Sequence, residues 1–138
     1  LKGVVVMTKY SKKQNLINKV YNALGGRPEQ MLYIFNNGGT NHYKIGITKD
    51  LNARYSDGKT FASGGLNIIK VVALDTREEA RFCEKTLHKY YKQFRTRPEE
   101  PRHEWFALCK AEVTKLCELE TKKDLLEFCK KVIDSQNK

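Results

Sequence analysis

Arg54 has a sequence context suited to binding phosphate. The strand-like segment 43–47 stops just after Gly46, and a short helical segment then places Arg54 one turn beyond Leu51. A basic residue fixed by a strand-to-helix turn is well placed to hold a phosphate. The alternative is an ordinary strand–turn–helix connection with a solvated arginine, and this stretch alone does not choose between them.

Glu84 and His88 form a second group with possible chemistry. They lie one turn apart in a predicted helix, beside its apolar stripe. A carboxylate at the border of a buried stripe is partly desolvated and needs a partner, which can be a cation, a donor network or a metal ion. The alternative is a simple surface pair at the i,i+4 spacing.

The predicted elements that position these residues belong to an α+β fold. Three apolar segments have strand character and predict a small antiparallel sheet of three strands flanked by helices: 31–35, 43–47 and 66–74. Thr48 is the expected cap of a helix over 49–56. The glycine-rich segment 61–65 is predicted to be a flexible loop that can close over a bound strand.

Three further helices are predicted. The first runs from a cap at Ser11 to Leu24 and carries lysines off its apolar stripe, which either face solvent or contact nucleic acid. Asp75 or Thr76 caps the next, whose stripe is Ala80, Cys83, Leu87, Tyr91 and Phe94. The last covers 110–135 with an interruption at 121–124, and Trp105, the only tryptophan, is expected to anchor the preceding segment against the sheet.

Composition indicates one basic domain. The 138 residues include 26 Lys+Arg and 16 Asp+Glu, a net charge of +10. Such a surplus favours a polyanionic partner, nucleic acid first and an anionic membrane surface second. The charge is concentrated in residues 1–27, which hold six basic residues and no acidic one, whereas residues 103–138 are balanced. No apolar run reaches the ~18 residues that span a bilayer.

The four cysteines do not suggest a zinc site. Cys83, Cys109, Cys117 and Cys129 form no CxxC pair, and the chain has only three histidines. Three of the four lie among apolar neighbours in helical patterns, as expected of buried thiols in a reducing compartment. A cytoplasmic or nuclear location is therefore expected.

The order of elements, together with these residues, resembles the GIY-YIG nuclease superfamily, in particular its divergent branch common in phages and large DNA viruses. The resemblance covers about residues 31–108. Tyr33 ends the segment that stands for Gly-Ile-Tyr, Lys44-Ile45-Gly46 stands for Tyr-Ile-Gly, and Arg54 follows Gly46 by eight residues. Glu84 matches the family's metal-binding glutamate. The ending resembles that of the branch in Leu87-His88, Arg97 and Glu104-Trp105-Phe106.

The resemblance implies a role for each matched residue. Tyr33 would be the general base, although a pKa near ~10 requires nearby cations to stabilise the phenolate. Arg54 and Lys44 would contact the phosphate, and Glu84 would bind Mg²⁺ or Mn²⁺. His88 would orient Glu84 or the water, or protonate the leaving group. The chain departs from the family where Lys44 replaces a tyrosine, although Tyr43 is adjacent, and at Gly58 and Glu104, where members often have histidine and asparagine.

The function expected from the resemblance is a divalent-metal-dependent DNA endonuclease. The alternative is a catalytically inactive nucleic-acid-binding module with the same fold. DNA, branched or damaged forms included, is the expected partner, with no membrane and no small-molecule cofactor. The expected division is a basic helical extension at 1–30, the nuclease domain at 31–108 and a C-terminal helix at 109–138. The expected DNA contacts are Lys49, Lys59, Arg95 and Arg97, and Tyr43 is a further catalytic candidate.

Overall fold

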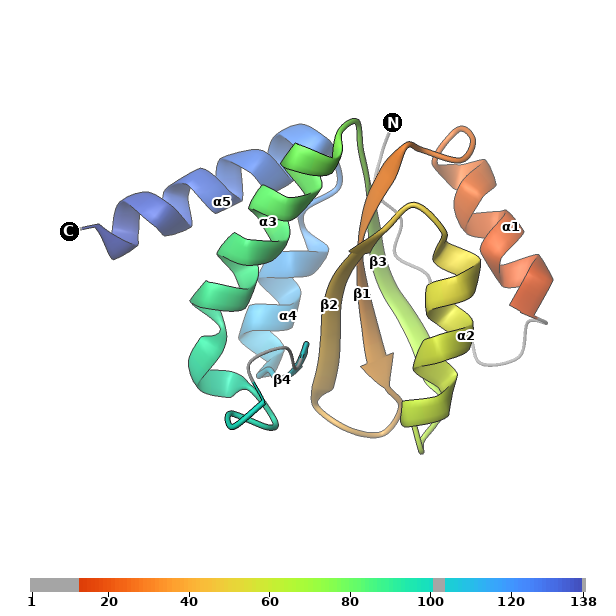
Figure 1. Ribbon diagram of the computed structural model, residues 1–138, viewed down its shortest axis with the longest axis horizontal. Coiled ribbons are helices and arrows are strands. Elements are labelled where there is room, and N and C mark those ends of the chain that lie inside the picture. Colours follow the sequence, from red (N-terminus) through yellow and green to blue (C-terminus); the bar gives the residue numbers. More distant parts are fainter. Residues whose placement is uncertain (1–12, 101–103, 138) are drawn as a thin grey trace.

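A computed structural model of the chain describes residues 13–100 and 104–137, in which helices cover both faces of an antiparallel sheet (Figure 1). The described part has four strands and five α-helices, which confirms the α+β class. In chain order the elements are α1 (Lys13–Ala23), β1 (Gln30–Asn37), β2 (His42–Thr48), α2 (Leu51–Phe61), β3 (Leu66–Leu74), α3 (Arg77–Tyr90), a 3₁₀ turn (Lys92–Phe94), β4 (Trp105–Ala107), α4 (Lys110–Cys117) and α5 (Lys122–Gln136).

The sheet has four strands in the order β3-β1-β2-β4, not the predicted three. The three predicted strands are confirmed as β1, β2 and β3. The additional strand β4 pairs with only three residues of β2, so that Trp105 lies opposite Lys44. Three residues are too few to show an alternating pattern, which is why the sequence did not indicate this strand. Because β4 is so short, most of β2 remains at the edge of the sheet.

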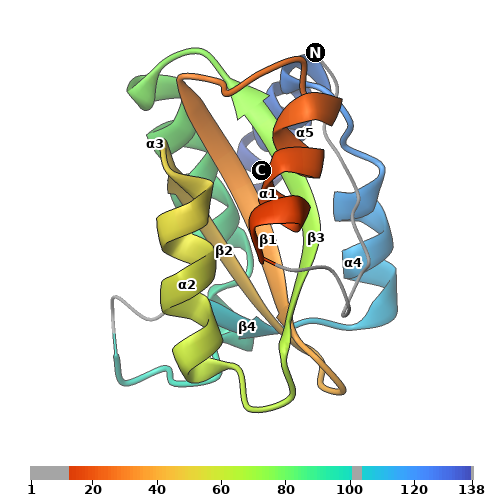
Figure 2. The same cartoon turned by 90° about the vertical axis from the view of Figure 1, so that its right-hand side faces the viewer.

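One face of the sheet is covered by α1 and α2 (Figure 2). Alternation along β1 points Met31, Tyr33 and Phe35 to this face, where they pack with apolar residues of both helices. The apolar stripe of α1 is buried as predicted, and Leu51 is fully buried at the start of α2. The predicted start of the first helix at Ser11 lies outside the described residues.

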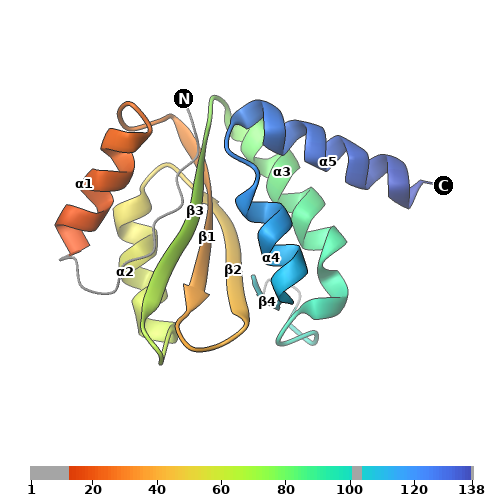
Figure 3. The same ribbon diagram turned by 180° about the vertical axis from the view of Figure 1, so that it is seen from behind.

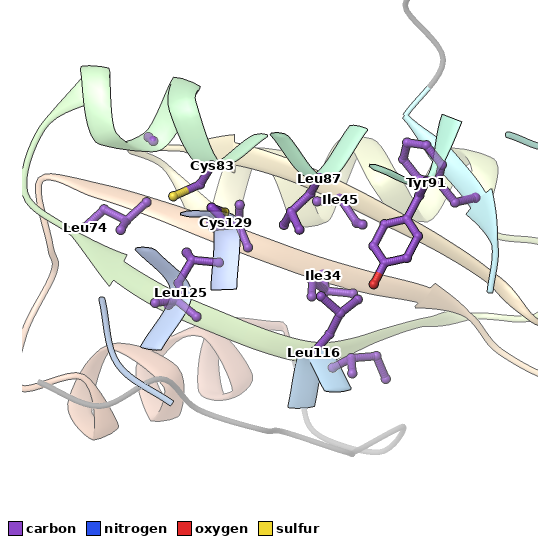
Figure 4. Packing of buried hydrophobic residues seen from close by; sticks show 14 of the residues in the cluster. Ile34, Ile45, Leu74, Cys83, Leu87, Tyr91, Leu116, Leu125 and Cys129 are labelled. Carbon is purple, nitrogen blue, oxygen red and sulfur yellow. The ribbon is translucent and has the colours of Figure 1, made fainter. Parts of the chain in front are cut away.

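The opposite face is covered by α3, α4 and α5 (Figure 3). Leu32 and Ile34 of β1 point into this core, with Cys83 and Leu87 of α3 and Cys129 of α5 (Figure 4). The apolar stripe predicted for α3 is therefore confirmed, except at its end. Phe94 is 39% exposed because the α-helix stops at Tyr90 and a 3₁₀ turn rotates the next residues out of the helical period.

The helix boundaries differ from prediction mainly in α2. Asp50, not Thr48, caps this helix by accepting a 3.1 Å hydrogen bond from the Ala53 amide. The Thr48 hydroxyl accepts from the Asp50 amide instead, at 2.9 Å. The helix continues to Phe61 rather than ending near Gly58, so part of the predicted flexible loop is helical. Position 58 requires glycine although it lies inside the helix, because a Cβ there would come within 2.8 Å of Leu66 Cδ2.

The predicted cap of α3 is confirmed at Thr76, and the structure adds a second cap at Thr121, which the sequence had placed only in an interruption. Thr76 forms a capping box with Glu79 at the start of α3, and Thr121 forms one with Asp124 at the start of α5. The break between α4 and α5 covers 118–121, so it overlaps the predicted interruption at 121–124 only at Thr121. Within the described residues, no helix has the length and apolar character needed to cross a bilayer.

Candidate active site at the edge of β2

Tyr33 lies across Gly46, its direct partner in the β1–β2 register. A Cβ at position 46 would come within 2.5 Å of Tyr33 Cζ and closer still to the hydroxyl oxygen. The glycine therefore leaves the space that the phenol ring occupies. Tyr33 is 1% exposed, and its ring packs against Phe35 at 4.3 Å between centroids. The ring is thus held in place between the two strands and α2.

Two side chains of α3 contact backbone groups in the part of β2 that β4 does not pair with. The Ile45 amide donates to the Glu104 carbonyl at 3.2 Å, just before β4. The Ile45 carbonyl then accepts a 2.7 Å hydrogen bond from His88 Nε2, and the Ile47 amide hydrogen-bonds to the Glu84 carboxylate. Because a carbonyl only accepts, His88 carries its proton on Nε2. Glu84 and His88 therefore both face the β2 edge, one turn apart on α3.

Glu84 lies in a partly desolvated and acidic environment. Burial is the main cause that raises the pKa of its carboxyl, and the negative charge of Glu104 raises it further. His88, the Ile47 amide and Arg81 act in the opposite direction. The partners that act on this carboxylate are the Ile47 amide and the charges of His88 and Arg81, whereas the His88 Nε2 proton is used by the Ile45 carbonyl.

The Tyr33 hydroxyl is subject to the charges of several elements. Burial raises the pKa of Tyr33 well above its ordinary value, and Glu104 is the next cause. Arg54 lowers the pKa, whereas Glu84 and Asp57 raise it. Arg54 comes from α2, Glu84 from α3 and Glu104 from the residue before β4. The structure thus brings Tyr33, Arg54 and Glu84 within electrostatic reach of one another.

Lys44 and Glu104 form an ion pair beside this hydroxyl. Lys44 Nζ lies 3.9 Å from a Glu104 oxygen and 6.0 Å from the centroid of the Tyr33 ring. The positive charge of Lys44 is therefore shared between the Tyr33 ring and the Glu104 carboxylate. Sequence reasoning did not assign Glu104 to the site, although its position in the Glu104-Trp105-Phe106 ending was a usable signal.

The basic residues of α2 lie at the surface. Arg54 is half-exposed and pairs with Asp57 one turn on, at 3.3 Å. Lys49 is exposed just before the helix, and its backbone carbonyl accepts hydrogen bonds from Arg27 at 2.7 and 3.1 Å. Lys59 Nζ lies 5.8 Å from the Tyr55 ring centroid. These cations form an exposed positive surface on one side of the β2 edge.

The remaining predicted site residues lie further from Tyr33. Tyr43 points to the opposite face of β2 and packs against the core under α3, α4 and α5. Arg95 bridges through its backbone to Phe106 of β4, and exposed Arg97 pairs with Glu100 at 3.4 Å. Both arginines therefore belong to the β4 end of the site rather than to the phenol.

The donor set fits a hydrated divalent cation held together with substrate. The described residues contain no cluster of three or more His, Cys, Asp or Glu that could enclose a metal. Glu84 and Glu104 supply hard carboxylate oxygens around one hydroxyl. Mg²⁺ commonly binds one or two carboxylates and completes its shell with water and phosphate oxygens. The two glutamates suit such an ion.

Comparison with known proteins assigns the family. Residues 30–120 match the family model of the T5orf172 domain. No curated protein and no solved structure matches the chain. The matched segment runs from β1 to just beyond α4 and includes every residue placed around the Tyr33 hydroxyl. It covers more than half of the sequence, so the chain belongs to the T5orf172 domain family.

Proposed function

We propose that this chain is a divalent-metal-dependent DNA endonuclease that hydrolyses phosphodiester bonds at the β2 edge. The observation that carries the proposal is the convergence of Arg54 and Glu84, from helices on opposite faces of the sheet, on the buried hydroxyl of Tyr33. The resemblance to the GIY-YIG superfamily supports it, since the same three residues match that family's base, arginine and glutamate. A basic chain of net charge +10 is suited to a nucleic-acid substrate.

Each residue has a role that its contacts allow. Tyr33 accepts the proton of the attacking water, and Arg54 exchanges its Asp57 partner for oxygens of the scissile phosphate, to which Lys44 adds positive charge. His88 uses Nε2–H to bond to Ile45, so that only the imidazolium form, which carries a second proton on Nδ1, can pass a proton to the leaving oxygen and become the neutral ring. A cation held by Glu84, with Glu104 nearby, would supply positive charge to the phosphate and lower the pKa of the phenol.

A catalytically inactive DNA-binding module is the second candidate. The observation in its favour is that Glu84 and His88 already satisfy backbone groups at the β2 edge, which is a structural role. Such a module binds DNA with a steep dependence on salt, through counterion release, and its binding does not depend on Glu84.

Cleavage assays with matched variants separate the two candidates. We expect wild-type protein to nick supercoiled plasmid or branched DNA in Mg²⁺ or Mn²⁺, and Glu84→Gln and Arg54→Gln to lose this activity. Glu127→Gln, an exposed acidic position on α5, is the matched control and retains it. Wild-type protein that cleaves no duplex, single-stranded or branched substrate in either metal refutes the nuclease.

A binding measurement tests the metal site independently of activity. Mn²⁺ should raise the melting temperature of wild-type protein and of Glu127→Gln, because an ion that binds only the folded state stabilises it. Glu84→Gln should lose this shift. An equal shift in Glu84→Gln would mean that the ion binds elsewhere.

All four cysteines are free thiols, which supports a reducing compartment for this activity.

A further inference from the structure

The exposed side of α3 carries a row of like charges that the proposed active site does not use. Arg77, Arg81, Lys85 and Lys89 follow one another at the i,i+4 spacing, and all four are exposed. We call these four residues the α3 ladder. Like charges at this spacing repel and destabilise a helix. Within the described part of the chain, none of the four forms an ion pair. Within the described residues the repulsion is therefore not relieved by any ion pair, although the charge of Arg81 acts on Glu84.

The α3 ladder passes the candidate active site at Arg81. Glu84 and His88 project from the same helix to the β2 edge, and the charge of Arg81 is close enough to lower the pKa of Glu84. Each step of four residues rises about 6 Å along the helix and turns it by about 40°. The ladder therefore winds slowly from the site-facing side of α3 towards its outer side.

The exposed cations of α2 lie on the other side of the site. Figure 1 shows β2 between α2 and α3, which cover opposite faces of the sheet. Lys49, Arg54 and Lys59 thus flank the β2 edge on one side, and the α3 ladder flanks it on the other. The DNA strand whose phosphate is held by Arg54 lies on the α2 side of the β2 edge. The ladder is then left facing a different part of the nucleic acid.

The direction of the ladder indicates what that part is. From Arg77 to Lys89 it spans about 18 Å along the axis of α3, the length of about five nucleotides of one strand of a duplex. In Figure 1, α3 runs alongside β2 rather than across its edge. A backbone that follows the ladder is therefore displaced sideways from the backbone at Arg54, as the two strands of a double helix are.

We propose that the α3 ladder binds the second strand of double-stranded DNA whose other strand lies at Tyr33, Arg54 and Glu84. The inference rests on the proposed function and adds to it a binding surface outside the active site, the α3 ladder, which holds the second strand. Four cations in a row match the regular negative charge of a phosphate backbone. Duplex binding also accounts for a helix surface that is self-repelling until its charges are neutralised.

The test compares salt dependence on two substrates. Full-length protein carrying Glu84→Gln, in EDTA so that no cleavage occurs, is titrated with a fluorescent duplex and with the corresponding single strand. The ladder variant adds R77Q, K85Q and K89Q and leaves Arg81 in place because its charge acts on Glu84. The matched control adds K123Q, K130Q and K131Q, which remove the same charge from exposed positions of α5.

Loss of three phosphate contacts should reduce the slope of log K against log salt by about 2.7 for the duplex. The single-strand slope and both slopes of the control should not change. An unchanged duplex slope in the ladder variant overturns the proposal, as does an equal loss on both substrates or in the control. Removing like charges does not weaken the helix, so circular dichroism should show a normal fold.

Cleavage by the ladder variant with Glu84 restored separates the two proposals. If the nuclease proposal holds, KM for duplex rises several-fold while kcat stays unchanged, because the ladder binds away from the reacting phosphate. If no variant cleaves anything, the nuclease fails, but the binding experiment still decides the role of the ladder. A fall in kcat at unchanged KM contradicts the proposal, since the ladder would then act on the chemistry and not on duplex binding.

Discussion

Replacement of Gly46 by alanine should destabilise the protein through Tyr33. The added Cβ would lie 2.5 Å from Tyr33 Cζ, whereas ordinary contact begins at 3.4 Å, so that the ring must move by about 0.9 Å. Tyr33 is 1% exposed and packs against Phe35, which leaves the ring little room. Overpacking of this kind costs about 1–3 kcal/mol. We expect a loss of that size in the free energy of unfolding, measured by urea titration.

A double-mutant cycle with Tyr33→Leu assigns the loss to this contact. Leucine has no ring over position 46, so Gly46→Ala should cost little in the Tyr33→Leu background. The coupling energy should then exceed about 1 kcal/mol. Gly39→Ala is the control: no atom lies within 4 Å of its Cβ, but its φ of +77° makes alanine unfavourable. Its cost should be the same in both backgrounds.

The opposite outcome for Gly46→Ala is equally clear. Glycine inside a strand is less stable than alanine by about 0.5–1 kcal/mol when nothing opposes the side chain. A neutral or stabilised Gly46→Ala protein, or a coupling energy near zero, would refute the close approach of the Tyr33 ring. The reading of this glycine as the space for the phenol would then be wrong. Cleavage by Gly46→Ala should also fall, because a displaced ring moves the hydroxyl.

Two further predictions concern charges on either side of the sheet. Burial lowers the pKa of Lys70, a 1% exposed residue of β3, so its charged form is unfavourable in the folded state. Lys70→Met should be more stable than wild type at pH 7 by about 1 kcal/mol, measured by urea titration. This difference should shrink as pH rises towards ~10.5, because folded wild-type protein then no longer carries the buried charge. A difference that stays constant with pH would contradict the desolvation of Lys70. Glu104→Gln removes a charge that raises the pKa of both Tyr33 and Glu84 and frees Lys44. The rising limb of its pH profile of kcat/KM should move to lower pH, whereas an unmoved limb, or the same shift in Glu127→Gln, would exclude this electrostatic role.

Local patterns predicted the elements that hold the site but not their exact ends. Alternation located β1, β2 and β3, and the cap at Thr76 followed from residue type. Gly58 was misleading, because a glycine usually ends a helix, whereas here its missing side chain admits Leu66, a contact from 8 residues further along the chain. Contacts between segments depend on the tertiary fold and cannot be predicted from local sequence patterns.

The same distinction applies to the candidate site. Family resemblance selected Tyr33, Arg54 and Glu84, and the structure brings Arg54 and Glu84 within electrostatic reach of the Tyr33 hydroxyl. The resemblance did not select Glu104, because the effect of that carboxylate depends on β4 pairing with β2 at Lys44. A three-residue strand leaves no periodic signal, so neither the pairing nor its electrostatic consequence could be derived from residue spacing.

Under the proposed mechanism, the acidic groups around Tyr33 would have opposite effects on its pKa before and after a cation binds. In the free protein, Glu84 and Glu104 add to burial and raise the pKa of the phenol, so Tyr33 remains protonated and unable to accept a proton. The same two carboxylates are the oxygen ligands that Mg²⁺ and Mn²⁺ prefer. A bound cation neutralises the charges that oppose ionisation. Under the proposed mechanism, Tyr33 therefore becomes a competent base only when the cation is present, which confines its reactivity to the metal-bound protein.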